Sequence, residues 1–221
     1  MTLFGFVQLF RGRPRRRLAQ QDAYGLWAES YLPAAHNAVM AAEQSIVEPI
    51  VRASKPRRAL DVGTGTGRYM PLLKAAGARQ VIGVDLSLPM LRQNTSPARI
   101  CADARRLPFR DAAFNLVSSS LMVGDVDHPG SWVIEASRVL ADGGALVYSD
   151  FHPCWVERDW RRTFRTADGE LVELAFHPHT IEQHLASLED ASFEVRAIRE
   201  PRVASIPAPV VVVFHAVKRP R

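Results

Sequence analysis

The sequence predicts an α/β fold in which helices cover a doubly wound, mostly parallel sheet. The first observation is a short apolar run, residues 59–62, that leads into three glycines at alternate positions. The second is the repeated alternation of strand-like and helix-like segments with short connections between residues 59 and 151. The third is a late pair of strand-like segments without a helix between them, which indicates an antiparallel hairpin at one edge of the sheet.

The first 18 residues carry the excess positive charge of the chain. Five arginines precede the first acidic residue, Asp22, and they are Arg11, Arg13, Arg15, Arg16 and Arg17. Without these five, the remaining 23 basic side chains equal the 23 acidic ones in number, so the folded body is close to neutral. We expect residues 1–18 to be a flexible, solvated basic arm. The alternatives are contact with RNA, with a membrane surface or with an acidic partner, and an organelle transit peptide.

Cysteine content indicates a reducing compartment, and hydropathy indicates that no segment spans a membrane. The two cysteines, Cys101 and Cys154, lie far apart in the sequence and do not form a disulfide framework. No apolar run is long enough to span a bilayer. We therefore expect a cytoplasmic protein without a membrane span.

Two helices precede the glycine-rich strand. Tyr24, Trp27, Ala28 and Tyr31 recur at helical spacing, and a second helix is expected over residues 34–51. These helices can close over a ligand as a lid, and the alternative is that their aromatic side chains only pack against the core.

The remaining elements follow in a regular order. Strands are predicted at residues 59–62, 80–84, 98–101, 114–119, 145–151, 193–198 and 210–217. Helices are predicted at residues 66–76, 88–94, 130–140 and 180–188. The polar and aromatic segment 155–176 reads as an excursion from the sheet that is long enough to shape a pocket.

The ends of the predicted strands carry residues suited to a nucleoside. In an open α/β sheet, ligands bind beyond the carboxyl ends of the strands. The first strand ends in the glycine turn, which lets a ligand approach the backbone, and a helix N-terminus follows. The next two strands end in Asp85, which can accept both hydroxyls of a ribose, and Asp103, which can accept from an adenine amine. The fourth strand ends in Ser118 to Ser120, so the implied ligand is an adenosine with a polar group attached.

Together these segments resemble the signature of class I S-adenosylmethionine-dependent methyltransferases. The segments are ALDVGTGTG at 59–67, VIGVDLS at 81–87, ADA at 102–104 and RVLADGG at 138–144. The similarity is greatest to the small-molecule (type 11) branch, which includes quinone and natural-product methyltransferases. It implies a Rossmann-like sheet of seven strands with an antiparallel last strand and an N-terminal helical lid.

The resemblance also implies a domain organisation. Residues 19–221 would form one methyltransferase domain after the arm. Within it, residues 19–51 would be the helical lid, 55–152 the cofactor-binding core, and 153–221 the acceptor-pocket excursion and the edge strands.

The implied cofactor is S-adenosyl-L-methionine, and its contacts can be assigned residue by residue. Asp61 would hold the methionine amine, Asp85 the ribose hydroxyls and Asp103 the adenine amine. The other implied contacts are Tyr24 of the lid, Gly63, Thr64, Gly65 and Gly67 of the turn, Leu86 and Ala104 near the adenine, and Ser119. The chain departs from the family at Asn115, where Asp is usual, and in lacking a histidine pair near Gly124 and Asp125.

The expected chemistry needs alignment more than acid–base catalysis. Holding a nucleophile in line with an electrophilic methyl group can supply about 7–11 kcal/mol. A general base is needed only for a protonated nucleophile, and the candidates are His152, directly after the fifth strand, and His128, after the fourth. His177 and His179 form a weaker pair. The spacing of these histidines is not that of a familiar metal site, so we predict no metal.

We therefore expect methyl transfer to a small aromatic or polycyclic acceptor, with no nucleic-acid partner. One alternative is an RNA methyltransferase that uses the basic arm. Another is a nicotinamide-dependent oxidoreductase, although Tyr69 stands where its G-x-G-x-x-G fingerprint requires a small residue. A third is a cofactor-binding protein without transfer chemistry.

Overall fold

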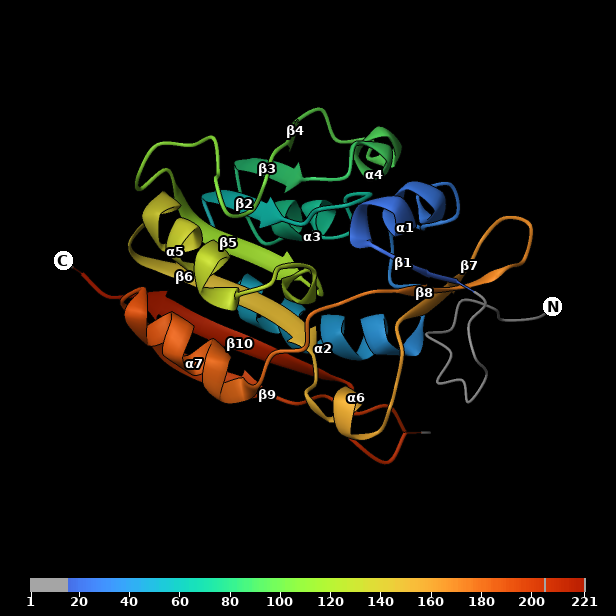
Figure 1. The fold of residues 1–221 in the computed structure, drawn as a ribbon. Helices are drawn as coiled ribbons and strands as arrows, with labels where there is room; N and C mark the ends of the chain where they lie inside the picture. The colour runs from blue at the N-terminus through green and yellow to red at the C-terminus, as the bar shows by residue number, and fades with distance from the viewer. Residues whose placement is uncertain (1–15, 205, 221) are drawn as a thin grey trace.

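The computed structural model describes residues 16–204 and 206–220. Its larger sheet has seven strands in the order β4-β3-β2-β5-β6-β10-β9 (Figure 1). The strands are β2 (Arg58–Val62), β3 (Gln80–Asp85), β4 (Arg99–Cys101), β5 (Phe114–Ser120), β6 (Leu140–Phe151), β9 (Phe193–Arg199) and β10 (Val211–Lys218). The first five run parallel, and β10 pairs antiparallel with both β6 and β9. The predicted seven-stranded sheet with an antiparallel last strand is confirmed.

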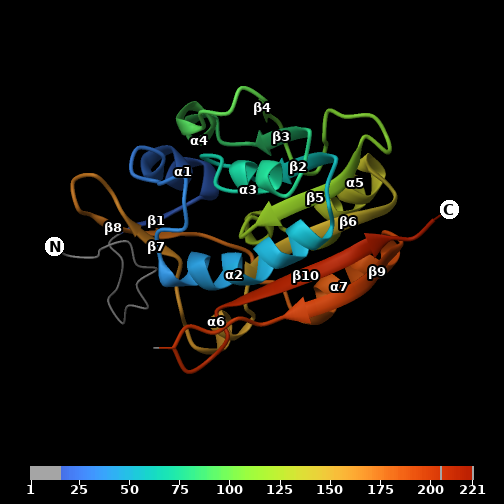
Figure 2. The same ribbon diagram turned by 180° about the vertical axis from the view of Figure 1, so that it is seen from behind.

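Helices cover both faces of this sheet, as Figures 1 and 2 show from opposite sides. On one face, α2 (Ala38–Ala53) and α3 (Met70–Ala75) pack against residues such as Ala59. On the other face, α5 (Pro129–Val139) and α7 (Ile181–Asp190) pack against residues such as Leu60. Neighbouring residues of one strand therefore belong to hydrophobic cores on opposite sides of the sheet, because successive side chains of a strand point to opposite faces.

A second, smaller sheet lies outside the seven-stranded one. It has the order β1-β8-β7, built from β1 (Arg16–Leu18), β7 (Thr163–Arg165) and β8 (Leu171–Leu174). Of the arm expected over residues 1–18, residues 16–18 are a strand parallel to β8, and residues 1–15 lie outside the described residues. Pairing with the free edge of β8 gives the backbone of these three residues hydrogen-bond partners, which the sequence pattern alone does not predict.

Several helix boundaries differ from the prediction because of local capping. The α2 helix begins at Ala38 rather than at 34, since the Asn37 side chain accepts a hydrogen bond from the Met40 amide at 2.9 Å. The first helix, α1 (Gln20–Trp27), ends before Tyr31. The glycine turn delays α3 to Met70. The remaining short elements are α4 (Leu88–Gln93), η1 (Val123–Asp125) and α6 (Cys154–Glu157).

Within the described residues, no helix combines the length and the apolar character that crossing a membrane requires.

Candidate functional site

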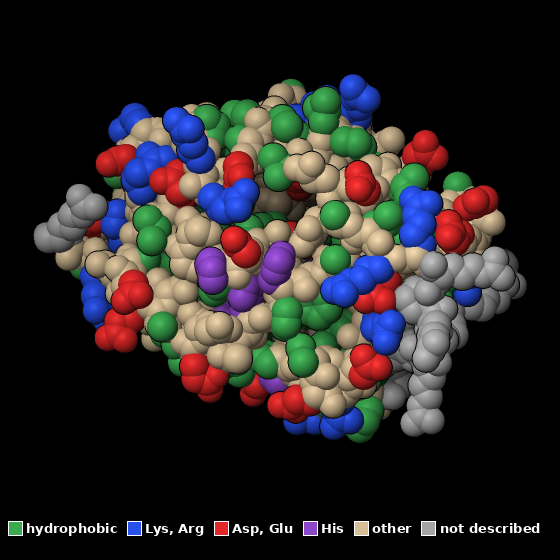
Figure 3. All heavy atoms as spheres, viewed as in Figure 1, with side chains coloured by type: hydrophobic (Ala, Val, Ile, Leu, Met, Phe, Trp, Pro, Cys, Tyr) green, Lys and Arg blue, Asp and Glu red, His purple; other side chains and the backbone are tan. Residues whose placement is uncertain are grey.

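A cavity opens beyond the carboxyl ends of β2, β3 and β5, and its mouth is a hollow on the face shown in Figure 3. The glycine turn after β2 forms its floor, and residues that follow β3, β4 and β5 form its sides. The α1 helix contributes Tyr24 and Trp27, and the segment leading into β7 contributes Arg162. The site therefore combines parts of the chain from the first described helix to the excursion.

The glycine turn is required by packing as well as by conformation. Gly63, Gly65 and Gly67 have φ angles of 71°, 52° and 92°, which L side chains rarely adopt. A Cβ on Gly63 would lie 2.5 Å from the Met122 Cγ, and one on Gly67 would lie 2.7 Å from the Asn94 Oδ1. A Cβ on Gly65 would meet only the Asp85 carboxylate, at 4.0 Å, so Gly65 leaves bare backbone facing the cavity.

The carboxylate of Asp85 is held in a fixed position by backbone amides. One oxygen accepts from the Gly65 amide at 2.7 Å, and the other accepts from the Ser87 amide at 2.8 Å. Burial raises the pKa of Asp85 to about 6, although these hydrogen bonds lower it. Each carboxylate oxygen can accept more than one hydrogen bond, so Asp85 retains acceptor capacity toward the cavity.

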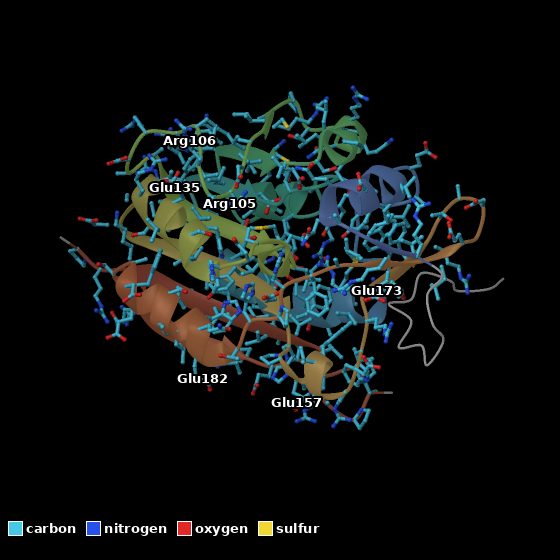
Figure 4. The ribbon with its side chains drawn as sticks, in the orientation of Figure 1. Arg105, Arg106, Glu135, Glu157, Glu173 and Glu182 are labelled. Carbon is cyan, nitrogen blue, oxygen red and sulfur yellow. The ribbon has the colours of Figure 1, made fainter. Side chains whose placement is uncertain are left out.

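Asp61 is a second buried carboxylate at the cavity, and its side chain accepts from the Ser118 hydroxyl at 2.8 Å. Burial raises the pKa of Asp61 to about 6 as well. Asp103 differs, because Arg105 donates to its carboxylate at 2.8 Å and lowers its pKa. Figure 4 labels Arg105 on the connection that follows β4. Two acidic side chains are thus deep in the cavity, and the third lies at a more exposed position.

Most of the predicted cofactor residues are brought together by the fold. Those that line the cavity are Tyr24, Asp61, Gly63, Thr64, Gly65, Asp85, Leu86, Asp103 and Ala104. Gly67 and Ser119 do not line it, and Ser120 does so in place of Ser119. The sequence identifies the strand ends correctly, but it does not decide which of three consecutive serines reaches the cavity.

The two candidate bases do not line the cavity. His152 Nε2 lies 2.8 Å from a carboxylate oxygen of Glu200, and its Nδ1 accepts from the Cys154 amide. Phe151, the preceding residue, is the one that lines the cavity. His128 is exposed at the N-cap position of α5. Both histidines follow a strand, as predicted, but neither side chain lines the cavity.

A buried ionic network that the sequence did not predict lies next to the cavity. Glu43 of α2 is fully buried and accepts from Arg68 at 3.0 Å, the Tyr69 hydroxyl at 2.7 Å, Ser120 at 2.7 Å and Ser149 at 2.8 Å. The Arg68 side chain is 8% exposed and lines the cavity. Its second terminal nitrogen, Nη1, is buried without a hydrogen-bond partner. A glutamate on the apolar face of a helix is the sequence signal that could have revealed this network.

A second missed cluster joins three parts of the chain. The Tyr24 hydroxyl of α1 donates to Asp125 of η1 at 2.6 Å. Arg162 of the excursion donates to Asp125 at 2.7 Å and to the Tyr24 oxygen at 2.8 Å. Its guanidinium also lies 4.7 Å from the centre of the Phe151 ring. All four residues line the cavity, so this cluster closes one of its walls.

Known proteins resemble this chain both in fold and in the sequence of the core. Residues 60–148 match the model of a family described as a methyltransferase domain. A malonyl-[acyl-carrier protein] O-methyltransferase from Pseudescherichia vulneris is 31% identical over 63% of this chain and 59% of its own length. A demethylmenaquinone methyltransferase from Renibacterium salmoninarum is 36% identical over 49% of this chain and 47% of its own length. The chain spans about half the length of the curated relatives it matches.

Among solved structures, an S-adenosylmethionine-dependent methyltransferase from Mesorhizobium loti aligns with a TM-score of 0.62 at 23% identity. The alignment covers 77% of this chain and 96% of that one. The strand order and this alignment show that the chain shares the fold of that structure. The sequence match to a methyltransferase domain is confined to residues 60–148, which include the glycine turn, Asp61 and Asp85.

Proposed function

We propose that this protein transfers a methyl group from S-adenosyl-L-methionine to a small acceptor of aromatic or polycyclic character. The observation that supports this proposal best is one cavity in which the ends of β2 and β3 and the turn after β2 bring together Asp61, Asp85 and Arg68. These residues offer two carboxylates and one unpartnered guanidinium nitrogen, which suit the polar ends of the cofactor. The aromatic side chains on the other walls suit the acceptor.

The residues of the cavity fit the parts of the cofactor one by one. We assign the ribose hydroxyls to Asp85, whose carboxylate is already oriented by the Gly65 and Ser87 amides. The methionine amine would bind Asp61, and the methionine carboxylate would bind the free Nη1 of Arg68. Leu86 is 48% exposed beside Asp85, which makes it available to cover one face of the adenine.

When bound, the cofactor supplies an electrophilic methyl group, and the protein has to exclude water and align the acceptor. Trp27, Tyr31 and Phe151 line the cavity, and aromatic faces tolerate a nearby cation. None of the cavity-lining residues in the described part of the chain is a histidine. We therefore propose that the acceptor atom needs no histidine base, as a carboxylate or an ionised hydroxyl would not. Relatives named for malonyl-[acyl-carrier protein] and demethylmenaquinone support testing both a carboxylate and a quinol.

Calorimetric titration with S-adenosylmethionine tests the cofactor assignment. We expect saturable binding by the wild type, weakened about 5- to 150-fold in Asp85→Ala because charged hydrogen bonds worth about 1–3 kcal/mol are lost. Asp190→Ala, at the exposed end of α7, is the matched control and should bind as the wild type does. Folded wild-type protein that gives no binding at high micromolar cofactor would overturn the proposal.

The acceptor is identified separately by transfer of a radiolabelled methyl group to a panel of quinols, phenols and acyl carboxylates. We expect label in an aromatic or polycyclic member of the panel. Transfer only to a straight-chain acyl carboxylate would retain the methyltransferase and reject the acceptor class.

A further inference from the structure

Three buried metal-ligating side chains lie together behind one wall of the cavity. Asp150 is on β6, His179 directly precedes the N-cap of α7, and His184 is on α7 itself. Their exposed fractions are 1%, 3% and 0%. Each offers one ligand atom, and the three atoms lie within 4.8 Å of one another. The proposed methyl transfer uses none of them, so the cluster needs an explanation of its own.

The distances within this cluster match those between ligands of one metal ion, and they also match long hydrogen bonds. A single carboxylate oxygen, Asp150 Oδ2, lies 3.3 Å from His179 Nδ1 and 3.4 Å from His184 Nε2. Good hydrogen bonds between nitrogen and oxygen are shorter, at about 2.7–3.2 Å. Ligands held about 2.0–2.1 Å from a tetrahedral zinc ion are about 3.3–3.4 Å apart, which matches the two separations between the Asp150 oxygen and the histidine nitrogens.

When both imidazoles are neutral, the Asp150 Oδ2 atom also lacks a hydrogen-bond donor from His179. His179 Nε2 faces the Asp127 carbonyl at 3.3 Å, and because a carbonyl only accepts, this is the nitrogen that carries the proton whenever the ring is neutral. Its Nδ1 then presents a lone pair to the negatively charged Asp150 oxygen. His184 Nε2 is fully buried and makes no hydrogen bond. A cation between the three atoms would satisfy both nitrogens and the carboxylate.

The outer partners of the histidines match those of metal-bound imidazoles. Ligating histidines usually direct their second nitrogen to a carbonyl, a carboxylate or water. His179 does so with the Asp127 carbonyl, and His184 Nδ1 lies 3.3 Å from the Tyr148 hydroxyl. The second oxygen of Asp150 accepts from the Gly124 amide at 3.2 Å and from the Phe151 amide at 2.8 Å. All three side chains are thus oriented from outside the cluster.

We propose that Asp150, His179 and His184 form a binding site for a divalent transition-metal ion of the zinc type. Two imidazole nitrogens and one carboxylate oxygen suit such an ion, with a fourth position available to water. The ion would join the end of β6 to the start of α7. Through Asp150 it would also fix Gly124 and Phe151, which adjoin or line the cavity wall. The competing occupant is a proton, because the Asp150 carboxylate raises the pKa of His179.

Cobalt(II) is a suitable probe because it replaces zinc and absorbs visible light. The full-length protein, stripped with a chelator, is titrated with Co²⁺ while the visible absorption is recorded. We expect one equivalent to bind, to be displaced by Zn²⁺, and to raise the thermal unfolding midpoint. In His179→Gln we expect the affinity to fall by more than about 100-fold, since loss of an outer partner alone costs 10–100-fold.

The controls separate this site from ordinary histidines at the surface. Figure 3 shows histidine side chains gathered just below the cavity mouth. His177→Gln removes an exposed ring two residues from His179 and should leave Co²⁺ binding unchanged. Asp150→Asn is a second test variant, and the far- and near-ultraviolet circular dichroism of each metal-free variant reports whether it is folded.

Equal Co²⁺ affinity in the wild type and in His179→Gln would overturn the proposal, as would the absence of visible bands in folded wild-type protein. If stability instead rises only as the pH falls, without a response to metal, a proton occupies the cluster and the proposal is wrong. Because metal binding is measured without cofactor or acceptor, this result does not depend on the proposed methyl transfer.

Discussion

Asp61 and Asp85 are carboxylic acids placed where their charge is poorly hydrated. Burial raises the pKa of each to about 6, even though Asp61 accepts from Ser118 and Asp85 accepts from two amides. The protein therefore keeps two costly charges at the cavity at neutral pH. A ligand that donates hydrogen bonds or carries a positive charge would offset that cost, and this is the chemistry we assign to the ribose and the methionine amine.

The pH dependence of cofactor binding tests this interpretation. The ionised carboxylate is the form that accepts from the ribose, so the affinity follows the ionised fraction of the free protein. We expect a constant affinity above about pH 7 and, well below pH 6, a decrease that approaches about a hundredfold per pH unit, because protonation of Asp61 and of Asp85 each opposes binding. Asp85→Asn should bind less tightly at pH 7.5 and decline less steeply. Calorimetry across this range checks the prediction, and a steeper loss at high pH would contradict it.

Arg68 provides a separate test at the opposite end of the cofactor. Arg68→Lys keeps the positive charge beside Glu43 but removes the terminal nitrogen that has no partner. The affinity for S-adenosylmethionine should fall about 10- to 100-fold, because a charged hydrogen bond is worth about 1.5–3 kcal/mol. Methylthioadenosine, which lacks the methionine carboxylate, should bind the wild type and the variant equally. Equal weakening of both ligands would mean that the substitution only disturbs the fold.

At the scale of elements, one hydroxyl of α1 forms hydrogen bonds with two other parts of the cavity wall. The Tyr24 oxygen contacts both Asp125 and Arg162, which belong to η1 and to the excursion. The Arg162–Asp125 pair at 2.7 Å remains without this hydroxyl. The contact is therefore suited to hold α1 in place without supporting the rest of the fold.

Tyr24→Phe should accelerate release of the cofactor about tenfold and leave the unfolding free energy within about 1–2 kcal/mol of the wild type. The reason is that only the hydrogen bonds between α1 and its neighbours are lost. Stopped-flow displacement measures the release rate. Tyr31→Phe is the matched control, because the Tyr31 ring lines the same cavity without joining this cluster. If both variants release the cofactor at the wild-type rate, α1 does not control release.

The sequence predicts the elements of the large sheet well because each is an apolar run bounded by turn residues. It does not predict β1, β7 and β8, which are three or four residues long and lack a clear alternation. Residues at strand ends, such as Asp61 and Asp85, are found because parallel strands end at one edge of the sheet. Arg68 and the Asp150 cluster are missed because their partners lie far away in the chain.

At the scale of the whole molecule, the cavity depends on contacts between distant segments. The small sheet packs its Phe164, Val172 and Leu174 against Ala23 of α1. Figures 1 and 2 show this sheet and α1 side by side at the end of the molecule that holds the cavity. The covering helix and the excursion therefore rest on a common apolar cluster, separate from the two cores of the large sheet.

Glu173 of β8 illustrates how closely the start of the described chain is joined to the excursion. Its carboxylate lies 3.5 Å from Arg17 of β1 and 3.2 Å from Arg161, and Figure 4 labels it on β8. The Ala175 amide also donates to the Leu18 carbonyl at 2.9 Å. Two of the arginines that composition assigns to a loose arm are thus part of an ordered edge.

The parallel pairing of β1 with β8 has a practical consequence for anyone shortening this protein. A version that begins at Gln20 keeps every predicted helix and every strand of the large sheet, yet it exposes the edge of β8. We expect such a version to be cleaved by trypsin after Arg161 or Arg165 much faster than the full chain. Adding S-adenosylmethionine should protect it only in part. Equal digestion rates would show that the three residues 16–18 do not brace the excursion.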